Sequence, residues 1–149
     1  MGVSLYYETE EAASERAVEE IVKEAARLEH SRAWMSEPIY FFDPVKAGHL
    51  KGNSKFAPSN WPMEDWSFAS WWDFRFILDA LARWSHEHNL RWKLSCEGEE
   101  VGRIREGEMD KAAREFLRQL AEMGGASSDE SANEQRAAEI IRRYESSLQ

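Results

Sequence analysis

The stretch from Trp61 to Cys96 constrains the fold more than any other, because it places a long apolar helix directly before an alternating strand. Six of the seven tryptophans of the chain lie in it. Residues 69–88 contain no proline or glycine, and their apolar side chains recur at spacings of three and four, as on one face of a helix. A second strip at Trp72 and Phe76 leaves only a narrow polar sector. We therefore expect a helix that is buried on two sides.

The strand that follows has a clear inside and outside. Residues 90–96 alternate strictly between apolar and polar side chains, which predicts one buried and one wet face. Residues 101–105 return after a turn, so we expect a β-hairpin in which Gly98 adopts a positive φ. Gly102 within the returning strand predicts a bulge or a close approach of another backbone.

The rest of the chain predicts a mixture of short strands and amphipathic helices. These further elements are a strand over 3–7, a helix over 11–29, a strand over 38–42 and a helix over 109–123. Residues 50–57 fit either a loop or a short edge strand. The prolines at 58 and 62 predict an irregular loop that continues through Trp66, so Trp61 and Trp66 are both expected on a loop.

These elements predict one α+β domain followed by a separate helix. We place the domain at residues 1–123, a flexible linker at 124–131 and a C-terminal amphipathic helix at 132–149, which opens on a capping box from Ser131 to Glu134. The expected order is β-α-β-(β)-α-β-β-α-α. The hairpin makes the sheet, of three to five strands, at least partly antiparallel, with the helices packed mainly on one face.

The charge of the chain narrows its possible partners. The net charge of −9 divides into about −5 for residues 1–30, +1 for 31–96 and −5 for 97–149. An acidic balance argues against nucleic acid and against anionic membranes as partners, because both need a basic surface. It permits a basic protein partner. A single cysteine, the lack of a long apolar run and the lack of a secretory leader predict a cytoplasmic protein.

Four residues are candidates for binding a ligand or a partner. Trp61 and Trp66 lie on the predicted loop beside Asp65, and a pair of tryptophans next to carboxylates can stack on a ring or anchor a protein. The alternative is that both indoles pack into the core. His49 is the one loop histidine, and it would need Asp43 or Asp65 to orient it as a general base.

No constellation in the sequence predicts a reaction. Cys96 lies on the apolar side of its strand, which favours an inert thiol. His86 and His88 are two residues apart and diverge on a helix, so we predict no metal site. The glycine-rich and nucleophile motifs of nucleotide-binding proteins and hydrolases are lacking, and we predict no catalytic residue and no cofactor.

Two classes of function remain. The first is a non-catalytic protein-binding or assembly module, which binds a protein partner or forms a homo-oligomer through the C-terminal helix. The second is a small enzyme or small-ligand-binding protein with a pocket under the Trp61–Trp66 loop, in which Asp65, His49 and Arg75 would take part.

Overall fold

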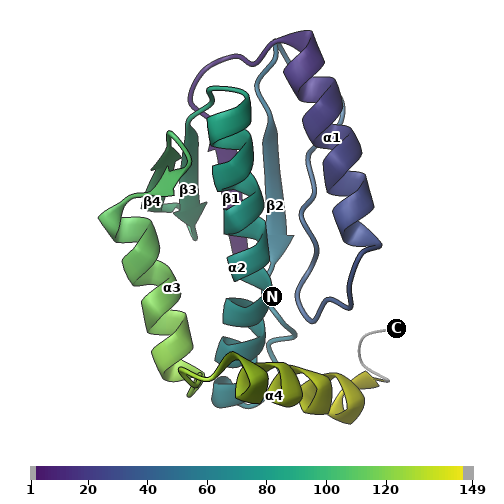
Figure 1. Ribbon diagram of the computed structural model, residues 1–149, viewed down its shortest axis with the longest axis vertical. Helices are drawn as coiled ribbons and strands as arrows, with labels where there is room; N and C mark the ends of the chain where they lie inside the picture. Colours follow the sequence, from purple (N-terminus) through teal and green to yellow (C-terminus); the bar gives the residue numbers. More distant parts are fainter. Residues whose placement is uncertain (1–2, 146–149) are drawn as a thin grey trace.

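The computed structural model describes residues 3–145 and shows the expected α+β architecture. Within that range the chain forms five strands and four helices in the order β-α-β-α-β-β-β-α-α. The elements are β1 (Ser4–Thr9), α1 (Glu15–Glu29), β2 (Lys51–Lys55), α2 (Met63–Glu87), β3 (Trp92–Cys96), β4 (Glu99–Arg105), β5 (Glu108–Met109), α3 (Lys111–Met123) and α4 (Glu130–Arg143). Helices α1 and α2 lie in front of the sheet in Figure 1, and α4 crosses the lower end of α2.

The strands form one antiparallel sheet in the order β2-β1-β3-β4-β5. The predicted hairpin is confirmed as β3 and β4, and Gly98 at its turn has a φ of 84°. The register shifts between Leu94 and Ser95, where β3 faces Gly102. A Cβ atom on Gly102 would lie 2.6 Å from the backbone of Ala113, so the lack of a side chain lets α3 pack directly on β4.

The central helix is longer than predicted, and this corrects the proposed loop. Helix α2 begins at Met63, directly after Pro62, so Trp66 lies in the helix and only Trp61 precedes it. A proline is compatible with a helix start because the first amide groups of a helix have no partner within it. At the other end Asn89 adopts a φ of 52°, the left-handed conformation in which many helices end.

The segment at residues 38–42 is not a full strand, although the sequence predicted one. It forms a single bridge from Phe41 to Gly52, on the outer side of β2. The edge strand at this side of the sheet is instead β2, within the range that fitted either a loop or a strand. Side chains in the segment still alternate, with Ile39 and Phe41 buried and Tyr40 and Phe42 exposed.

The core lies between the sheet and the three helices α1, α2 and α3. Trp84 and Trp92 are fully buried there, and the Phe41 ring stacks on Trp92 with centroids 5.8 Å apart. A second apolar cluster forms where α4 packs on the start of α2, around Phe68, Trp72 and Ile140.

Helix α4 starts two residues before the predicted position, and Asp129, not Ser131, accepts the capping hydrogen bond. The connection from α3 is tied to α4, since the Ser127 amide donates to the Asn133 side chain at 2.8 Å. Residues 146–149 of the predicted helix lie outside the described residues. The division of the chain into a domain, a linker and a separate helix stays a prediction.

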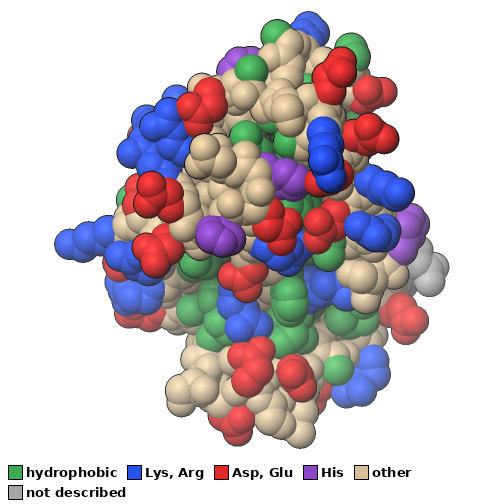
Figure 2. Space-filling view, turned by 45° about the horizontal axis from the view of Figure 1, so that its top comes forward, with side chains coloured by type: hydrophobic (Ala, Val, Ile, Leu, Met, Phe, Trp, Pro, Cys, Tyr) green, Lys and Arg blue, Asp and Glu red, His purple; other side chains and the backbone are tan. Residues whose placement is uncertain are grey.

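No helix among residues 3–145 combines the length and the apolar character that crossing a membrane requires. On the face shown in Figure 2, acidic and basic side chains are interspersed over the surface and are not gathered by sign.

Candidate functional site: the open face of the sheet

Within the described residues 3–145, no helix covers one face of the sheet, and the strand register defines which side chains lie on it. Leu5 and Tyr7 of β1 point into the core, so Tyr6 and Glu8 point outward. Strand pairing places Asn53 and Ser95 on either side of Tyr6, and Lys51 and Lys93 on either side of Glu8. Two rows of side chains therefore run across this face, one centred on Tyr6 and the other on Glu8.

The outer segment at residues 38–42 extends both rows with an aromatic side chain. Because Phe41 pairs with Gly52, Tyr40 lies opposite Asn53 and Phe42 opposite Lys51. We call Tyr6, Tyr40 and Phe42 the aromatic patch. Their exposed fractions are 44%, 54% and 43%, which are high values for large apolar side chains. The rings of Tyr40 and Phe42 lie 5.9 Å apart.

Partly buried hydrogen bonds hold the outer segment that carries Tyr40 and Phe42. The amide of Tyr40 donates to the hydroxyl of Tyr7 at 2.9 Å, and that hydroxyl lies 2.8 Å from Oγ of Ser54. Ser54 in turn donates to the carbonyl of Pro38 at 2.9 Å. Burial raises the pKa of Tyr7 well above its usual value, so its hydroxyl stays protonated at neutral pH. The core thus holds the outer segment in place by its backbone.

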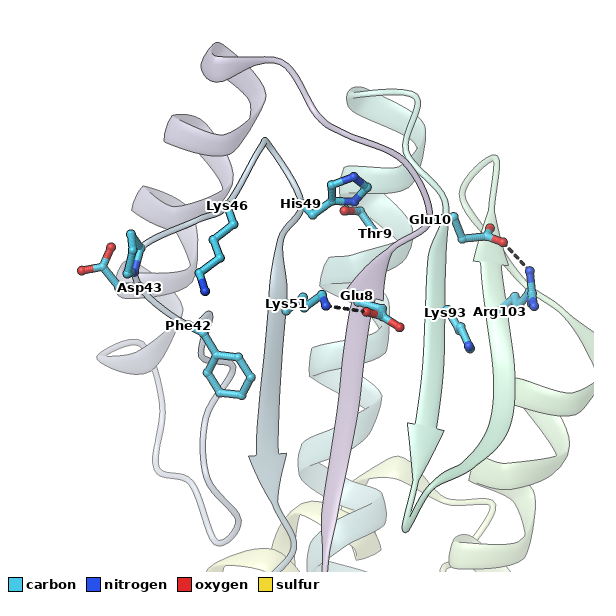
Figure 3. A pocket seen from close by; sticks show the side chains of 11 residues that line it. Glu8, Thr9, Glu10, Phe42, Asp43, Lys46, His49, Lys51, Lys93 and Arg103 are labelled. Carbon is cyan, nitrogen blue, oxygen red and sulfur yellow. Dashed lines mark hydrogen bonds and ion pairs between the residues drawn. The ribbon is translucent and has the colours of Figure 1, made fainter.

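A pocket of about 860 Å³ opens on this face beside the loop at residues 42–49. In Figure 3 the strands lie in front of α2, and the labelled side chains come from β1, from Glu10 directly after it, from β2, β3 and β4, and from that loop. We call this cavity the corner pocket. Its lining residues are Glu8, Thr9, Glu10, Phe42, Asp43, Pro44, Lys46, His49, Lys51, Lys93 and Arg103.

The charges of the corner pocket are unevenly paired. Nζ of Lys51 lies 3.6 Å from a carboxylate oxygen of Glu8, and Arg103 forms ion pairs with Glu10 and Glu100. Glu10 also forms an ion pair with Arg105, whose Nη2 lies 3.3 Å from Oε1 of Glu10. Among residues 3–145, Lys46 and Lys93 form no ion pair, and the carboxylate of Asp43 points away from the cavity in Figure 3. The unpaired charge that faces the cavity is therefore positive.

The loop that bounds the pocket is held in one conformation. Lys46 and His49 form a bridge, with the His49 amide donating to the Lys46 carbonyl at 3.0 Å. Ala47 and Gly48 between them have φ values of 54° and 77°, as in a tight hairpin turn. The Ala13 amide donates to the Gly48 carbonyl at 2.9 Å, which fixes the turn to the start of α1.

The structure separates the four residues that the sequence singled out. Trp61 is only 5% exposed and stacks on Tyr144, which follows α4. Asp65 accepts from the Tyr144 hydroxyl at 2.8 Å and pairs with Arg143 at 3.0 Å. Trp66 is partly buried and stacks on Phe56. Trp61 and Asp65 contact the end of α4, and Trp66 packs on the core. The two tryptophans therefore follow the alternative in which both indoles pack inside the protein.

His49 lies in a different place, in the corner pocket on the open face of the sheet. It does not meet Asp65, which lies on α2 on the other face. Asp43 lines the same pocket, but its carboxylate is directed away from the His49 ring in Figure 3. Arg75 makes ion pairs with Glu130 of α4 at 2.9 Å. The proposed set of Asp65, His49 and Arg75 is thus not assembled.

The environment of Cys96 disfavours a reactive thiolate. Burial raises the pKa of the Cys96 thiol, and the neighbouring Glu97 charge raises it further, so the thiolate is scarce at neutral pH. Among residues 3–145, no three histidine, cysteine, aspartate or glutamate side chains gather in a way that could hold a metal ion.

The sequence did not reveal the corner pocket, because its residues come from separate segments of the chain. One part of it could have been found: strict alternation in residues 90–96 places Lys93 on the wet face. The partners of Lys93 across the sheet follow only from the register of β1 and β2.

Comparison with known proteins adds no relative of this chain. No protein-family model matches the sequence, and neither the curated proteins nor the solved structures give a significant match.

Proposed function

We propose that this protein is a non-catalytic protein-binding module and that it binds its partner through the open face of the sheet. The observation that supports this is the aromatic patch. Three of the large apolar side chains that are exposed in the described part of the chain gather on this face. Tyrosine is enriched at protein interfaces, because its ring offers apolar contact and its hydroxyl a hydrogen bond.

The edge of the sheet next to the aromatic patch is covered, which favours the face as the binding surface. The segment at residues 37–42 covers β2, with the Phe42 amide donating to the Lys51 carbonyl at 2.8 Å and the Glu37 amide to Lys55 at 2.9 Å. The opposite edge consists of the two-residue β5 and of residues 99–103 of β4, which β5 does not pair. A covered edge discourages the addition of a further strand. At the β2 side a partner would therefore contact side chains more than backbone.

The charges of the face favour a protein over a polyanion. Around the aromatic patch, cations such as Lys51 and Arg103 alternate with Glu8 and Glu10. A nucleic acid or an anionic membrane needs a continuous basic surface, and the net charge of −9 opposes both. We propose a cytoplasmic location, on the basis of the single cysteine of the chain.

The proposal is tested by comparing what the protein captures from a lysate with and without the aromatic patch. The test variant is Tyr6→Ser combined with Tyr40→Ser. The control is Met63→Ser combined with Met123→Ser, which also removes two exposed apolar side chains but lies away from the open face. We expect a partner that the wild type and the control both retain and the test variant loses. Equal capture by all three proteins, or loss in the control alone, would refute the proposal.

A further inference from the structure

We propose that the partner of the open face is a second copy of this chain, packed face to face around a two-fold axis that runs along the strands between β1 and β2. The inference rests on the proposed function, because it names the partner of the same surface. In a two-fold dimer the same patch of each chain contacts the other, so the patch must be complementary to itself. The order of side chains across the sheet meets this requirement.

The row centred on Glu8 alternates in charge. From the outer segment to β3 it consists of Phe42, Lys51, Glu8 and Lys93 (Figure 3). The proposed rotation exchanges the positions of β1 and β2, so Lys51 of each copy would face Glu8 of the other. Within one chain this pair is loose, at 3.6 Å, and exposed, so by itself it stabilises little. In the dimer, each Glu8 carboxylate would lie between two ammonium groups.

The ends of this row match as well. The same rotation exchanges the positions of the outer segment and β3, which places Lys93 of one copy over the exposed ring of Phe42 of the other. Lys93 forms no ion pair with another described residue. An ammonium group above the face of an aromatic ring is attracted by the quadrupole of the ring. Each Lys93 would therefore gain an interaction that its own chain does not provide.

The row centred on Tyr6 is uncharged from the outer segment to β3, and it matches by size. The rotation places Tyr6 opposite Asn53 of the second copy and Tyr40 opposite Ser95. Each pair joins an exposed tyrosine to a smaller polar side chain, so the two faces can interdigitate. The amide or hydroxyl group of the smaller residue can hydrogen-bond to the tyrosine hydroxyl.

Other two-fold placements of the two faces fit less well. An axis along β1 would set Glu8 against Glu8, and Lys51 against Lys93, so like charges would meet. An axis between β1 and β3 would set Lys51 against Arg103. An axis perpendicular to the strands would bring the charged row onto the uncharged row, and both lysines would face neutral side chains.

The size of the face determines the expected strength of the dimer. Strands lie about 4.8 Å apart and rise about 3.3 Å per residue, so the face from the outer segment to β4, over the six residues of β1, covers roughly 500 Å² in projection. A standard interface buries about 800 Å² per partner, so we expect a reversible dimer with a dissociation constant on the order of 1–100 µM. Facing sheets pack with their strands within about 30° of each other, which this axis allows.

The test is sedimentation analysis of the full chain over a range of concentrations, with charge-reversal variants. We expect a monomer–dimer equilibrium in the wild type that shifts toward monomer as the salt concentration rises. Glu8→Lys would set a lysine against Lys51, and Lys51→Glu would set a glutamate against Glu8. Each change occurs twice in the dimer, so either variant alone should dimerise more weakly by roughly tenfold or more. An equimolar mixture of the two variants should dimerise again, because opposite charges meet at both positions.

Matched controls separate this geometry from attraction by net charge. Glu19→Lys and Lys23→Glu make the same changes in charge at exposed positions of α1, on the helical side of the sheet. Each should dimerise within about twofold of the wild type, since neither site is in the interface. A mixture of Glu8→Lys with Lys23→Glu has the same net charges as the rescuing mixture and should not restore the dimer.

The variant without the aromatic patch gives an independent measurement. Tyr6→Ser with Tyr40→Ser should also weaken the dimer by roughly tenfold or more, because buried tyrosines carry much of the energy of an interface. Met63→Ser with Met123→Ser should leave the dimer as it is in the wild type, because both methionines lie away from the open face.

Three results would overturn the proposal. The first is a wild type that stays monomeric well above the expected dissociation constant. The second is a dimer that both Glu8→Lys and Lys51→Glu leave intact, because another surface such as α4 would then hold it. The third is a mixture of these variants that stays monomeric, or that dimerises no better than the control mixture. A monomeric wild type that still captures a different protein through the open face would refute the second copy and leave the proposed function standing.

Discussion

The indole of Trp61 stacks on the ring of Tyr144, with centroids 4.1 Å apart and planes inclined by 18°. This contact joins the segment that leads into α2, two positions before the helix begins, to the residue after α4. It explains why Trp61, which was predicted on an exposed loop, is buried. Trp61 therefore belongs to the packing that holds α4 on the domain.

Replacing Trp61 by alanine should consequently cost stability. Emptying a buried tryptophan site typically lowers the free energy of unfolding by about 3–5 kcal/mol. Met63→Ala, two residues away at a side chain that is 64% exposed, should change it by less than about 0.5 kcal/mol. Chemical denaturation of both variants measures the difference. If both variants lose only a similar small amount of unfolding free energy, Trp61 does not contribute to the core and a binding role is favoured.

A second relationship, between Tyr7 and Tyr40, connects the core to the aromatic patch. Tyr7→Phe removes the hydroxyl that accepts a hydrogen bond from the Tyr40 amide and contacts Oγ of Ser54. The Tyr40 amide and the Ser54 hydroxyl would each lose this partner. We expect a loss of about 1–3 kcal/mol in the free energy of unfolding and faster hydrogen exchange at the Tyr40 amide. Tyr6→Phe is the control, since the Tyr6 side chain is on the exposed face. Unchanged exchange at Tyr40 in Tyr7→Phe would contradict this account.

The sequence allowed much of the fold to be predicted where a pattern was both long and local. The alternation in residues 90–96 and the turn at Gly98 each depend on neighbouring residues alone. The helix start was missed because Pro62 is compatible with either a loop or a helix start, and contacts that hold the first turns, such as the stacking of Trp66 on Phe56, do not show in a local pattern.

The candidate site was harder to predict, since it depends on contacts between distant segments. Glu8, Lys51 and Lys93 are neighbours only because β1 pairs with both β2 and β3. The segment at residues 38–42 shows the same dependence. Its β-branched and aromatic residues predicted a strand, but its single bridge to Gly52 depends on its position outside β2, which no local pattern encodes.

Asp73 gives a prediction for the pH dependence of stability. It is fully buried on α2, pairs with Arg32 at 2.9 Å and accepts from the Met35 amide at 2.8 Å. Burial raises its pKa to about 6, against the opposing effects of these partners. The folded protein therefore binds this proton more strongly than the unfolded chain does. The contribution of Asp73 to stability is greatest below pH ~4 and falls as the pH rises through about 6.

The measurement compares wild type with Asp73→Asn, because many other carboxylates titrate in the same range. The free energy of unfolding of the wild type, relative to that of the variant, should fall by up to about 3 kcal/mol between pH ~4 and pH ~7. Groups common to both proteins, such as Asp79, cancel in this difference. A relative stability that rises over this range would mean that the ion pair with Arg32 outweighs burial.

Helix α4 packs its apolar face on α2 within the same chain. Its role in forming a homo-oligomer stays a prediction. Ile140 is fully buried against the start of α2, and its neighbour Ile141 is only partly buried. Ile140→Ala should lower the free energy of unfolding by about 2–5 kcal/mol. Ile141→Ala should cost less, because its side chain loses less contact. Denaturation combined with light scattering separates the two roles of the helix. If Ile140→Ala leaves the stability unchanged but reduces the mass of a homo-oligomer, α4 is an assembly element and its contact with α2 is secondary.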